Sequence, residues 1–305
     1  MSAQFVTTEV TRFDAAKNIF VPETKFTAVE VCFDLRLNGK SFRQIFCSPV
    51  DLEDLTVGVL AQAGKISSID DVTRLDIDAA NFAIDVATST VDKLSANDFD
   101  AANFAIDVTT STVDKLSTDD IDAANFAIDV TTSTVDKLSA NDFDAANFAI
   151  DVETSPVAET SDDELCDVQF SAKKILACAD KLLGELSPTH AKTNGVHGGL
   201  LFDGEKILLV REDIGRHNVF DKIHGAALRQ RINLRDKVLI FSGRCSAEMI
   251  GKLHRMKIPV VAAKSVPTTQ SIDLARKFGI TLAARMSAGS FCIYTYPQRI
   301  VLEEG

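Results

Sequence analysis

The chain has 305 residues, of which 46% are hydrophobic, so it can bury a substantial core as one large domain or two ordinary ones. It contains no run of about 18 apolar residues, the length of a membrane helix, and its first residues lack the basic and apolar regions of a secretory signal, so we expect a cytoplasmic protein outside the membrane. The net charge of −12 combines an acidic middle (residues 70–165, 23 acidic against four basic) with a basic end (residues 166–305, 13 acidic against 21 basic). The basic end favours an anionic ligand. Because it does not interleave aromatic with basic residues, we expect a small molecule rather than nucleic acid.

A tandem repeat with a period of 22 residues occupies the middle of the chain. Its first copy, Ser67–Thr88, differs in its first half from the three copies in residues 89–154, which are nearly identical. Each copy contains NFAIDV, whose alternation predicts a half-buried strand with Phe82, Ile84 and Val86 of the first copy on one face. We therefore predict a small β-rich subdomain in residues 1–88, a β-repeat insertion in residues 89–154 and an acidic linker in residues 155–169. The insertion is either a partner-binding extension or a tolerated duplication.

Residues 170–305 alternate between helical and strand patterns, beginning with an amphipathic helix in residues 170–186 that the following SPTH is expected to end. Strands are predicted in GGLLF, KILLV, KVLIFS, PVVAAKS, ITLAARM and SFCIYTYP, and helices between them in NVFDKIHGAALRQR, SAEMIGKLHRM and TQSIDLARKFG. This alternation predicts a three-layer α/β/α domain with a mixed, largely parallel sheet. Ligands of such sheets bind at the carboxyl ends of the strands.

The densest polar stretch, REDIGRHNVFDKIHG in residues 211–225, lies between a predicted strand and a helix. Gly215 would permit a sharp turn, and Arg216 can present its donor fork to a phosphate at the helix start. His217 can donate a hydrogen bond or move a proton. Asp213 can fix the arginine or accept hydrogen bonds from a base or sugar, although a buried ion network that locks the turn is an alternative.

Two more glycine-containing turns carry candidate site residues, His197 in TNGVHGG and Arg244 in FSGRCSAE, and we expect all three turns to line one ligand site. The H-x-E and P-C-x-x-C pairs of the zinc deaminases are absent from the sequence, so we expect no metal. The glycine-rich fingerprints of nucleoside triphosphate and dinucleotide sites are absent as well.

Several segments together resemble the formate dehydrogenase accessory family FdhD: TNGVHGGLLF, REDIGRHNVFDKIHGAAL, FSGRCSAEMIGKL, IPVVAAKSVPTTQSIDLA, FCIYTYPQRI and, for its N-terminal part, CSPVDLEDLTVGVLAQAGKI. The resemblance covers residues 20–86 and 170–301, and it implies a fold similar to that of the cytidine deaminases without the zinc site, as well as a homodimer. It also implies a sulfurtransferase that takes persulfide sulfur from a cysteine desulfurase. That sulfur passes to the molybdenum bis-molybdopterin guanine dinucleotide cofactor before formate dehydrogenase receives it. The family's cofactor-contacting loop corresponds to Arg285, Met286, Ser287, Ala288, Gly289 and Ser290.

The chain departs from the family at the sulfur-carrying loop, Cys-Gly-x-Cys-Gly, because repeats and linker stand in its place and the six cysteines form no Cys-x-x-Cys pair. Most of these cysteines are expected to be small buried residues. Two are candidates for the persulfide: Cys166, whose acidic neighbours disfavour a thiolate, and Cys245, which follows Arg244 at a helix start. The chain is therefore either a sulfur carrier or a non-enzymatic paralogue that binds the cofactor as a chaperone.

Overall fold

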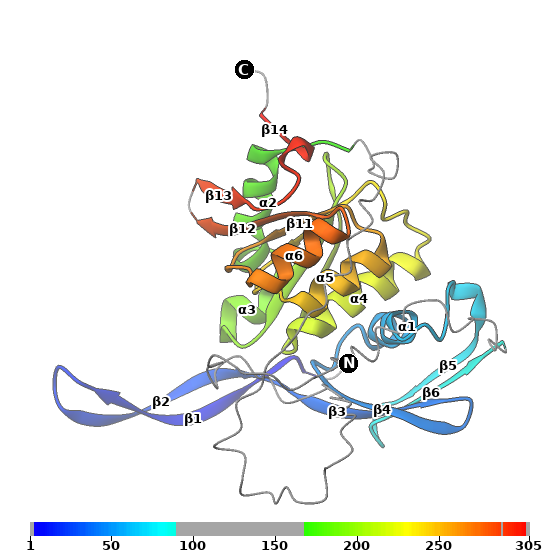
Figure 1. The fold of residues 1–305 in the computed structure, drawn as a ribbon. Helices are drawn as coiled ribbons and strands as arrows, with labels where there is room; N and C mark the ends of the chain where they lie inside the picture. The colour runs from blue at the N-terminus through cyan, green and yellow to red at the C-terminus, as the bar shows by residue number, and fades with distance from the viewer. Residues whose placement is uncertain (1–2, 90–167, 288, 303–305) are drawn as a thin grey trace, which may run out of the picture. The chain divides into compact units, whose positions relative to one another are not determined.

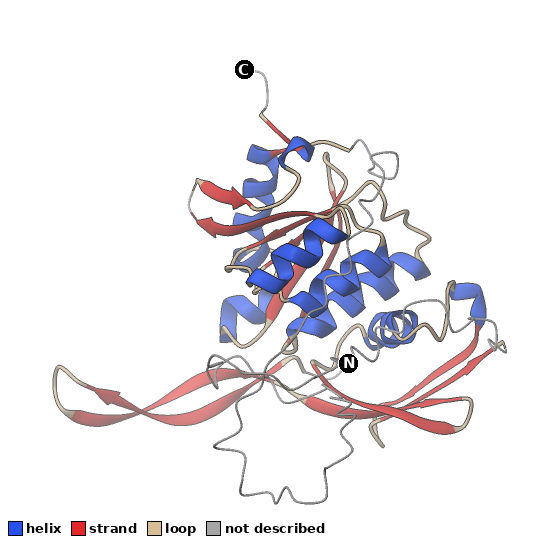
Figure 2. Ribbon diagram, viewed as in Figure 1, coloured by secondary structure: helices blue, strands red, loops and turns tan. Residues whose placement is uncertain are grey.

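The computed structural model describes residues 3–89, 168–287 and 289–302, which belong to one compact unit. The predicted insertion at residues 89–154 and linker at residues 155–169 lie outside the described residues, apart from their outermost positions. Within the described ranges, no helix is both long and apolar enough to cross a membrane. The described chain is a mixed α/β structure with several sheets and six α-helices (Figure 2).

The chain begins with a hairpin that forms a two-stranded sheet of its own (Figure 1). Its strands β1 (Phe5–Asp14) and β2 (Ile19–Ala28) pair antiparallel over their full length. At one end, the ammonium of Lys192 lies 4.5 Å from the centroid of the Phe5 ring. Large apolar side chains along the hairpin are exposed: Val6, Phe13, Ile19, Phe20 and Phe26.

A four-stranded sheet in the order β4-β3-β6-β5 follows, built from β3 (Val31–Leu37), β4 (Lys40–Cys47), β5 (Val72–Asp78) and β6 (Ala83–Thr88). The strand predicted in the first repeat copy is β6, and its Ile84 and Val86 are buried. Phe82 was expected on the same buried face but is 48% exposed, because it precedes the strand with a left-handed backbone (φ 50).

The largest sheet has the order β13-β12-β11-β10-β8-β9. Its strands are β8 (His197–Phe202), β9 (Ile207–Asp213), β10 (Val238–Phe241), β11 (Val260–Ala263), β12 (Thr281–Ser287) and β13 (Ser290–Ile293). Only β10, β11 and β12 run parallel, and the other three pairings are antiparallel. The sheet is mixed as predicted but not largely parallel, because β8–β9 and β12–β13 are hairpins, and a short turn joins only antiparallel neighbours.

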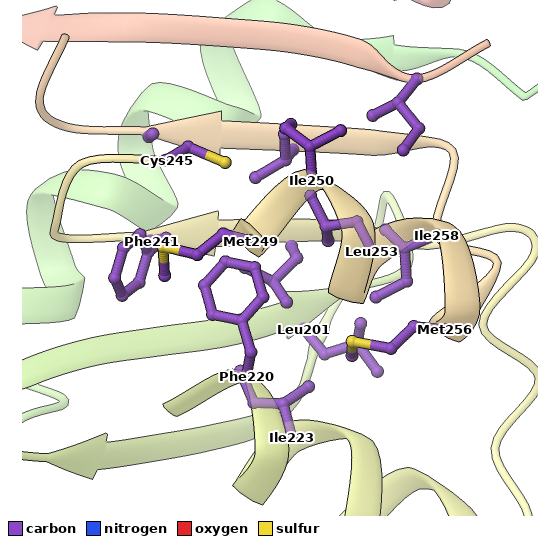
Figure 3. Close-up of a cluster of buried hydrophobic side chains, with 14 of the residues drawn as sticks. Leu201, Phe220, Ile223, Phe241, Cys245, Met249, Ile250, Leu253, Met256 and Ile258 are labelled. Carbon is purple, nitrogen blue, oxygen red and sulfur yellow. The ribbon is translucent and has the colours of Figure 1, made fainter. Parts of the chain in front are cut away.

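Helices pack on both faces of this sheet. The first group is α4 (Arg216–Arg229), α5 (Ala247–Met256) and α6 (Thr269–Lys277), which share one buried cluster with β8, β10 and β11. In Figure 3, Phe220 of α4 lies beside Phe241 of β10, with ring centroids 5.0 Å apart. The opposite face of the same strands packs on α2 (Ala172–Gly184).

The shorter elements are α3 (Pro188–Thr193), β7 (Phe170–Ser171) and β14 (Ile300–Val301), of which the last two form a parallel pair, and two 3-10 helices, Ile69–Asp71 and Pro297–Arg299. SPTH was predicted only to end the preceding helix. Instead, Pro188 starts α3, because a proline fits the first turn of a helix, where its missing N–H costs nothing.

Helix α1 (Leu52–Gln62) crosses α4 at very close range. A Cβ atom on Gly58 would lie 1.8 Å from the Asp221 carbonyl oxygen, and one on Gly225 would lie 1.8 Å from the Asp54 carbonyl oxygen. Only glycine fits at both positions. Beside the crossing, the Arg211 guanidinium donates to the Asp54 carboxylate (2.6 Å and 2.9 Å), so the N-terminal residues are locked onto α4 and β9.

Candidate functional site

The strand register brings the predicted turns to one edge of the largest sheet. β8 runs antiparallel to both of its neighbours, with His197 opposite Asp213 of β9 and Gly199 opposite Phe241 of β10. The start of β8 therefore lies beside the ends of β9 and β10. The ends of β11 and β12 lie at the same edge because these strands run parallel to β10. We call the start of β8 and the turns after β9, β10, β11 and β12 the site edge.

Hydrogen bonds from backbone N–H groups join neighbouring turns along the site edge. The Gly198 N–H donates to the Ser242 hydroxyl (2.9 Å), and the Ser242 N–H donates to the Gly198 carbonyl (2.9 Å). Farther along, the Ser265 N–H donates to the Gly243 carbonyl (3.4 Å) and the Arg285 N–H donates to the Ser265 carbonyl (3.1 Å). The turns are thus held in a fixed order, and the binding of a ligand by them stays a prediction.

His197 stands at the start of β8 rather than inside a turn. Its ring lies 5.9 Å from that of Phe241, and a Cβ atom on Gly243 would lie 3.0 Å from its Nδ1. Burial, together with the nearby charges of Arg216, His190 and His217, lowers the pKa of His197. His197 is therefore a neutral ring at neutral pH, which can donate one hydrogen bond and accept one.

Arg216 and His217 occupy the first turn of α4 and lie next to α5. The Nε–H of Arg216 donates to Nε2 of His217 (3.3 Å). On the other side of the ring, Nδ1 of His217 lies 3.1 Å from Oε1 of Glu248, which belongs to the first turn of α5. Arg244, in the turn before α5, is exposed. The structure therefore brings Arg216, His217 and Arg244 to the two adjacent helix starts.

Asp213 does not face the ligand side of its turn, because its side chain is completely buried. One carboxylate oxygen lies 2.7 Å from the ammonium of Lys222, which is also completely buried, and accepts from the Ser48 N–H (3.1 Å). The other accepts from the Gly215 N–H (2.8 Å) and from the Asn218 amide (2.9 Å). Of the two alternatives for Asp213, the buried ion network is the one found. The buried Asp213 carboxylate therefore stabilises the turn and does not contact a ligand.

Gly215 also has a different role from the one predicted. Its backbone (φ −86, ψ 116) is an ordinary extended conformation that any residue can adopt. A Cβ atom there would lie 2.8 Å from Nδ2 of Asn218, so the glycine leaves room for the amide that reaches Asp213. Glycine is therefore needed at position 215 because a side chain would not fit there, and not because the backbone turns sharply.

Residues 285–290, which correspond to the family's cofactor-contacting loop, run from the end of β12 through the β12–β13 turn to the first residue of β13. Arg285 and Gly289 have left-handed backbones (φ 57 and φ 79), and the hydroxyls of Ser287 and Ser290 lie 2.9 Å apart at the exposed tip. Met286 is only 8% exposed and packs in the cluster beneath α2, so its side chain does not point to the tip. Ala288 lies outside the described residues.

The two candidate sulfur carriers are placed very differently. Cys166 lies outside the described residues. Cys245 is completely buried in the cluster between the sheet and α5, and burial raises the pKa of its thiol to about 12. The thiolate-favouring setting expected from Arg244 is not found, because the sulfur points into the core (Figure 3). Among the described cysteines, Cys292 on β13 is the exposed one, and nothing in its sequence neighbourhood marked it.

Sequence reasoning missed three residues that hold the site edge together: Lys222, Ser48 and Glu248. Lys222 lies on the apolar stripe of α4 between Val219 and Ile223, and a lysine in that position indicates a buried ion pair, so the pattern could have revealed it. Ser48 bonds to a residue 165 positions away, which no local pattern reports. Glu248 has the ordinary appearance of an acidic residue in a first helical turn.

No group of three or more His, Cys, Asp or Glu side chains is arranged to hold a metal ion within residues 3–89, 168–287 and 289–302.

Comparison with known proteins confirms the resemblance found in the sequence. The chain is 29% identical to the sulfur carrier protein FdhD of Geobacillus kaustophilus over 285 residues, covering 93% of each protein. It is 39% identical to the sulfur carrier protein FdhD of Bacillus subtilis over 142 residues, covering 47% of this chain and 54% of that protein. The fold matches a crystal structure described as a formate dehydrogenase accessory protein from Desulfotalea psychrophila, with a TM-score of 0.68 at 18% identity, covering 98% of this chain and all of that one.

The sequence profile of the FdhD/NarQ family matches residues 28–301, which include every part of the site edge. A match over most of the chain settles its family. The chain belongs to the FdhD/NarQ family.

Proposed function

We propose that this chain is an accessory protein of formate dehydrogenase that carries sulfur from a cysteine desulfurase to the molybdenum bis-molybdopterin guanine dinucleotide cofactor. Family membership and the full-length relatives named as sulfur carriers support the sulfur-carrying part. The observation that carries the cofactor part is the convergence of the turns on one site edge.

The site edge fits a polyanionic cofactor. α4 and α5 begin there, and neither N-cap residue, Gly215 or Ser246, caps the unpaired amides of its helix with a side chain. The Ser246 hydroxyl oxygen is buried and has no hydrogen-bond partner within the described residues, so it is available to a ligand. Arg216 and Arg244 lie beside these helix starts. Helix N-termini and guanidinium groups both bind phosphate, which suits the diphosphate of a guanine dinucleotide.

The cofactor, when bound, supplies the molybdenum centre that receives the sulfur, and this chain's residues bind and orient it. We assign His197 and Arg216 to contacts with the dinucleotide and Arg285, Ser287 and Ser290 to contacts from the β12–β13 turn. Asp213 and Met286 act beneath the surface, since both are buried.

Sulfur transfer needs a cysteine thiolate that the persulfide of a desulfurase can reach. Cys245 does not meet this requirement, because its sulfur is buried and its pKa is raised to about 12. We propose Cys166 for the role on its position in the sequence, next to the helix that follows the family's sulfur-carrying loop, although its acidic neighbours disfavour the thiolate.

Sulfur labelling tests this function. The purified protein is incubated with a cysteine desulfurase and radiolabelled cysteine, and thiol-releasable label is measured on the wild type and on Cys166→Ser, with Cys245→Ser and Cys292→Ser as matched controls. We expect label on the wild type and on both controls but not on Cys166→Ser. Absence of label from a wild type that still binds GDP would overturn the carrier function and support a cofactor chaperone. Complementation of a strain that lacks its formate dehydrogenase accessory protein tests the same function in the cell.

We also propose that the protein is a cytoplasmic homodimer. The β1–β2 hairpin supports self-association because it exposes five large apolar side chains. Its three acidic and three basic residues give it no net charge, so two copies of the hairpin do not repel each other although the whole chain has a net charge of −12. Light scattering on the purified protein should give a dimer for the wild type and a monomer for Phe13→Ser combined with Phe20→Ser. A wild-type monomer would contradict this.

A further inference from the structure

Arg216, His217 and Glu248 form a connected group between α4 and α5. The Nε–H of Arg216 donates to Nε2 of His217 (3.3 Å), and Nδ1 of the same ring lies 3.1 Å from Oε1 of Glu248. The Nδ1 atom is buried, and its contact with Glu248 has the distance of an ion pair without the geometry of a standard hydrogen bond. The ring is thus held between a cation on one side and an anion on the other.

These contacts select one tautomer of His217. An Nε2 atom that accepts a hydrogen bond carries no proton, so the neutral ring carries its proton on Nδ1. That proton faces the Glu248 carboxylate. In the other tautomer, Nε2–H and the Arg216 Nε–H would point at each other as two donors, and the bare Nδ1 would face an anion.

Glu248 can act as that anion at neutral pH. Burial raises the pKa of Glu248, but the nearby His217, Lys252 and Arg216 together lower it by more, so that its pKa lies below the ordinary value. Lys252 is also paired with Asp221 (2.7 Å). From β8, His197 faces the same group, and it is held neutral by burial and by the neighbouring cations.

We propose that Glu248 is a positioning residue: it holds His217 as the Nδ1–H tautomer, so that Nε2 fixes the Arg216 guanidinium in one orientation at the site edge. Glu248 acts through His217, and its side chain is 54% exposed, so the effect is moderate in size. The consequence for ligand binding rests on the proposed function, whereas the tautomer itself does not.

Nitrogen NMR of the histidine rings tests the tautomer without any ligand. The His217 signal is identified by its loss in His217→Phe. We expect the Nδ1–H form in the wild type and in Glu248→Gln, because the amide oxygen of glutamine keeps a partial negative charge opposite Nδ1–H. Glu248→Ala should populate the Nε2–H form. Glu205→Ala is the matched control. Glu205 is a glutamate that also forms an ion pair, with Lys174, but it lies in the exposed turn between β8 and β9, at the opposite end of these strands from His217.

Two outcomes would overturn the proposal: an Nε2–H ring in the wild type, or a Glu248→Ala spectrum in which His217 is unchanged. A merely structural role for Glu248 would lower stability without changing the tautomer, and it would not be rescued by glutamine. Urea unfolding of the same variants therefore accompanies the spectra.

Calorimetric titration with GDP measures the consequence for binding. Glu248→Ala should weaken GDP binding about fivefold, the value of one net hydrogen bond, and Glu248→Gln should stay close to the wild type. A wild type that binds no GDP but shows the Nδ1–H ring would overturn the proposed cofactor site and leave the positioning role standing. A wild type that binds GDP and shows the Nε2–H ring would overturn the positioning role alone.

Discussion

The turn between β9 and α4 and the turn between β12 and β13 both carry residues predicted to bind the ligand, but they are held in opposite ways. In the first, Asp213 and Lys222 are completely buried, and the backbone of Ser48 is bonded to the same carboxylate. In the second, Arg285 is exposed near the end of β12, and Met286 is the described residue of the segment 285–290 whose side chain is buried in the core. The first turn is therefore anchored by a buried charge network, and the second by backbone pairing. Substitutions in the two turns should separate stability from binding.

The largest expected effect comes from breaking the buried ion pair. Lys222→Met leaves the Asp213 carboxylate buried without its cation, which should lower the free energy of unfolding by about 3–5 kcal/mol. Urea unfolding measures it. Lys222→Met combined with Asp213→Asn should recover a large part of the loss, because no uncompensated charge remains. If Lys222→Met were as stable as the wild type, the Asp213–Lys222 ion pair would not stabilise the turn.

The crossing of α1 and α4 should be the next most sensitive point. Gly225→Ala places a Cβ atom 1.8 Å from the Asp54 carbonyl oxygen, so the helices must move apart. We expect a loss of about 1–3 kcal/mol in the free energy of unfolding. Gly251→Ala in α5 is the matched control: nothing lies within 4 Å of its new Cβ, and it should gain about 1 kcal/mol from helix propensity. Equal effects at the two glycines would contradict the close crossing.

Buried His224 should make stability depend on pH. Burial, with Lys252 and Arg255 nearby, lowers the pKa of His224 to about 4. Because the unfolded chain binds the proton at higher pH than the folded one, stability is full above the unfolded pKa and falls as the pH drops toward 4. We expect a loss of about 2 kcal/mol between pH 7.5 and pH 5 from this residue. His224→Gln should remove that part of the slope in urea unfolding measured at both pH values, and an unchanged slope would exclude the residue as its source.

The β12–β13 turn should show the reverse behaviour. Arg285→Ala should weaken GDP binding about threefold, as expected for one exposed phosphate contact, and leave the free energy of unfolding unchanged. Met286→Ala should lower the free energy of unfolding by about 2 kcal/mol because its side chain fills the core. If Arg285→Ala destabilised the protein and left binding intact, the contrast between the two turns would be wrong.

The smallest expected effect concerns the repeats. Deletion of residues 89–154 removes three nearly identical copies and leaves the first copy, whose strand β6 is part of the four-stranded sheet. The shortened protein should bind GDP with unchanged affinity and unfold at the same urea concentration. A shortened chain that fails to fold would show that the repeats are structural.

The sequence predicts the elements of the C-terminal half well, because apolar runs and amphipathic periodicity are local properties. The strand ends that form the site edge were found in this way. The sheet was called largely parallel because the pattern of single strands does not report their direction. The turn Asp203–Lys206, held by hydrogen bonds to the Asp203 carboxylate, makes β9 antiparallel to β8, and a second hairpin makes β13 antiparallel to β12.

The roles of individual site residues could be predicted less well. Within residues 211–218, the side chains of Glu212 and Asp213 are buried, whereas Arg216 and His217 stand partly exposed at the start of α4, and sequence alone does not separate the two groups. The sequence leaves both alternatives open for Asp213, because its partner Lys222 lies on the following helix and its partner Ser48 lies in a loop far away along the chain. Cys245 was considered a thiolate because its neighbour Arg244 is close in sequence, whereas the packing of α5 decides where the sulfur points.

The most direct test of the account is a calorimetric titration of GDP into the wild type, Arg216→Ala and Arg276→Ala. Arg276 is the control, because it is an exposed arginine in the last turn of α6 and is paired with Asp273. The account predicts that GDP binds the wild type and Arg276→Ala equally and Arg216→Ala about tenfold more weakly, with all three proteins folded. Equal affinity of the wild type and Arg216→Ala would contradict the claim that the site edge holds a guanine nucleotide.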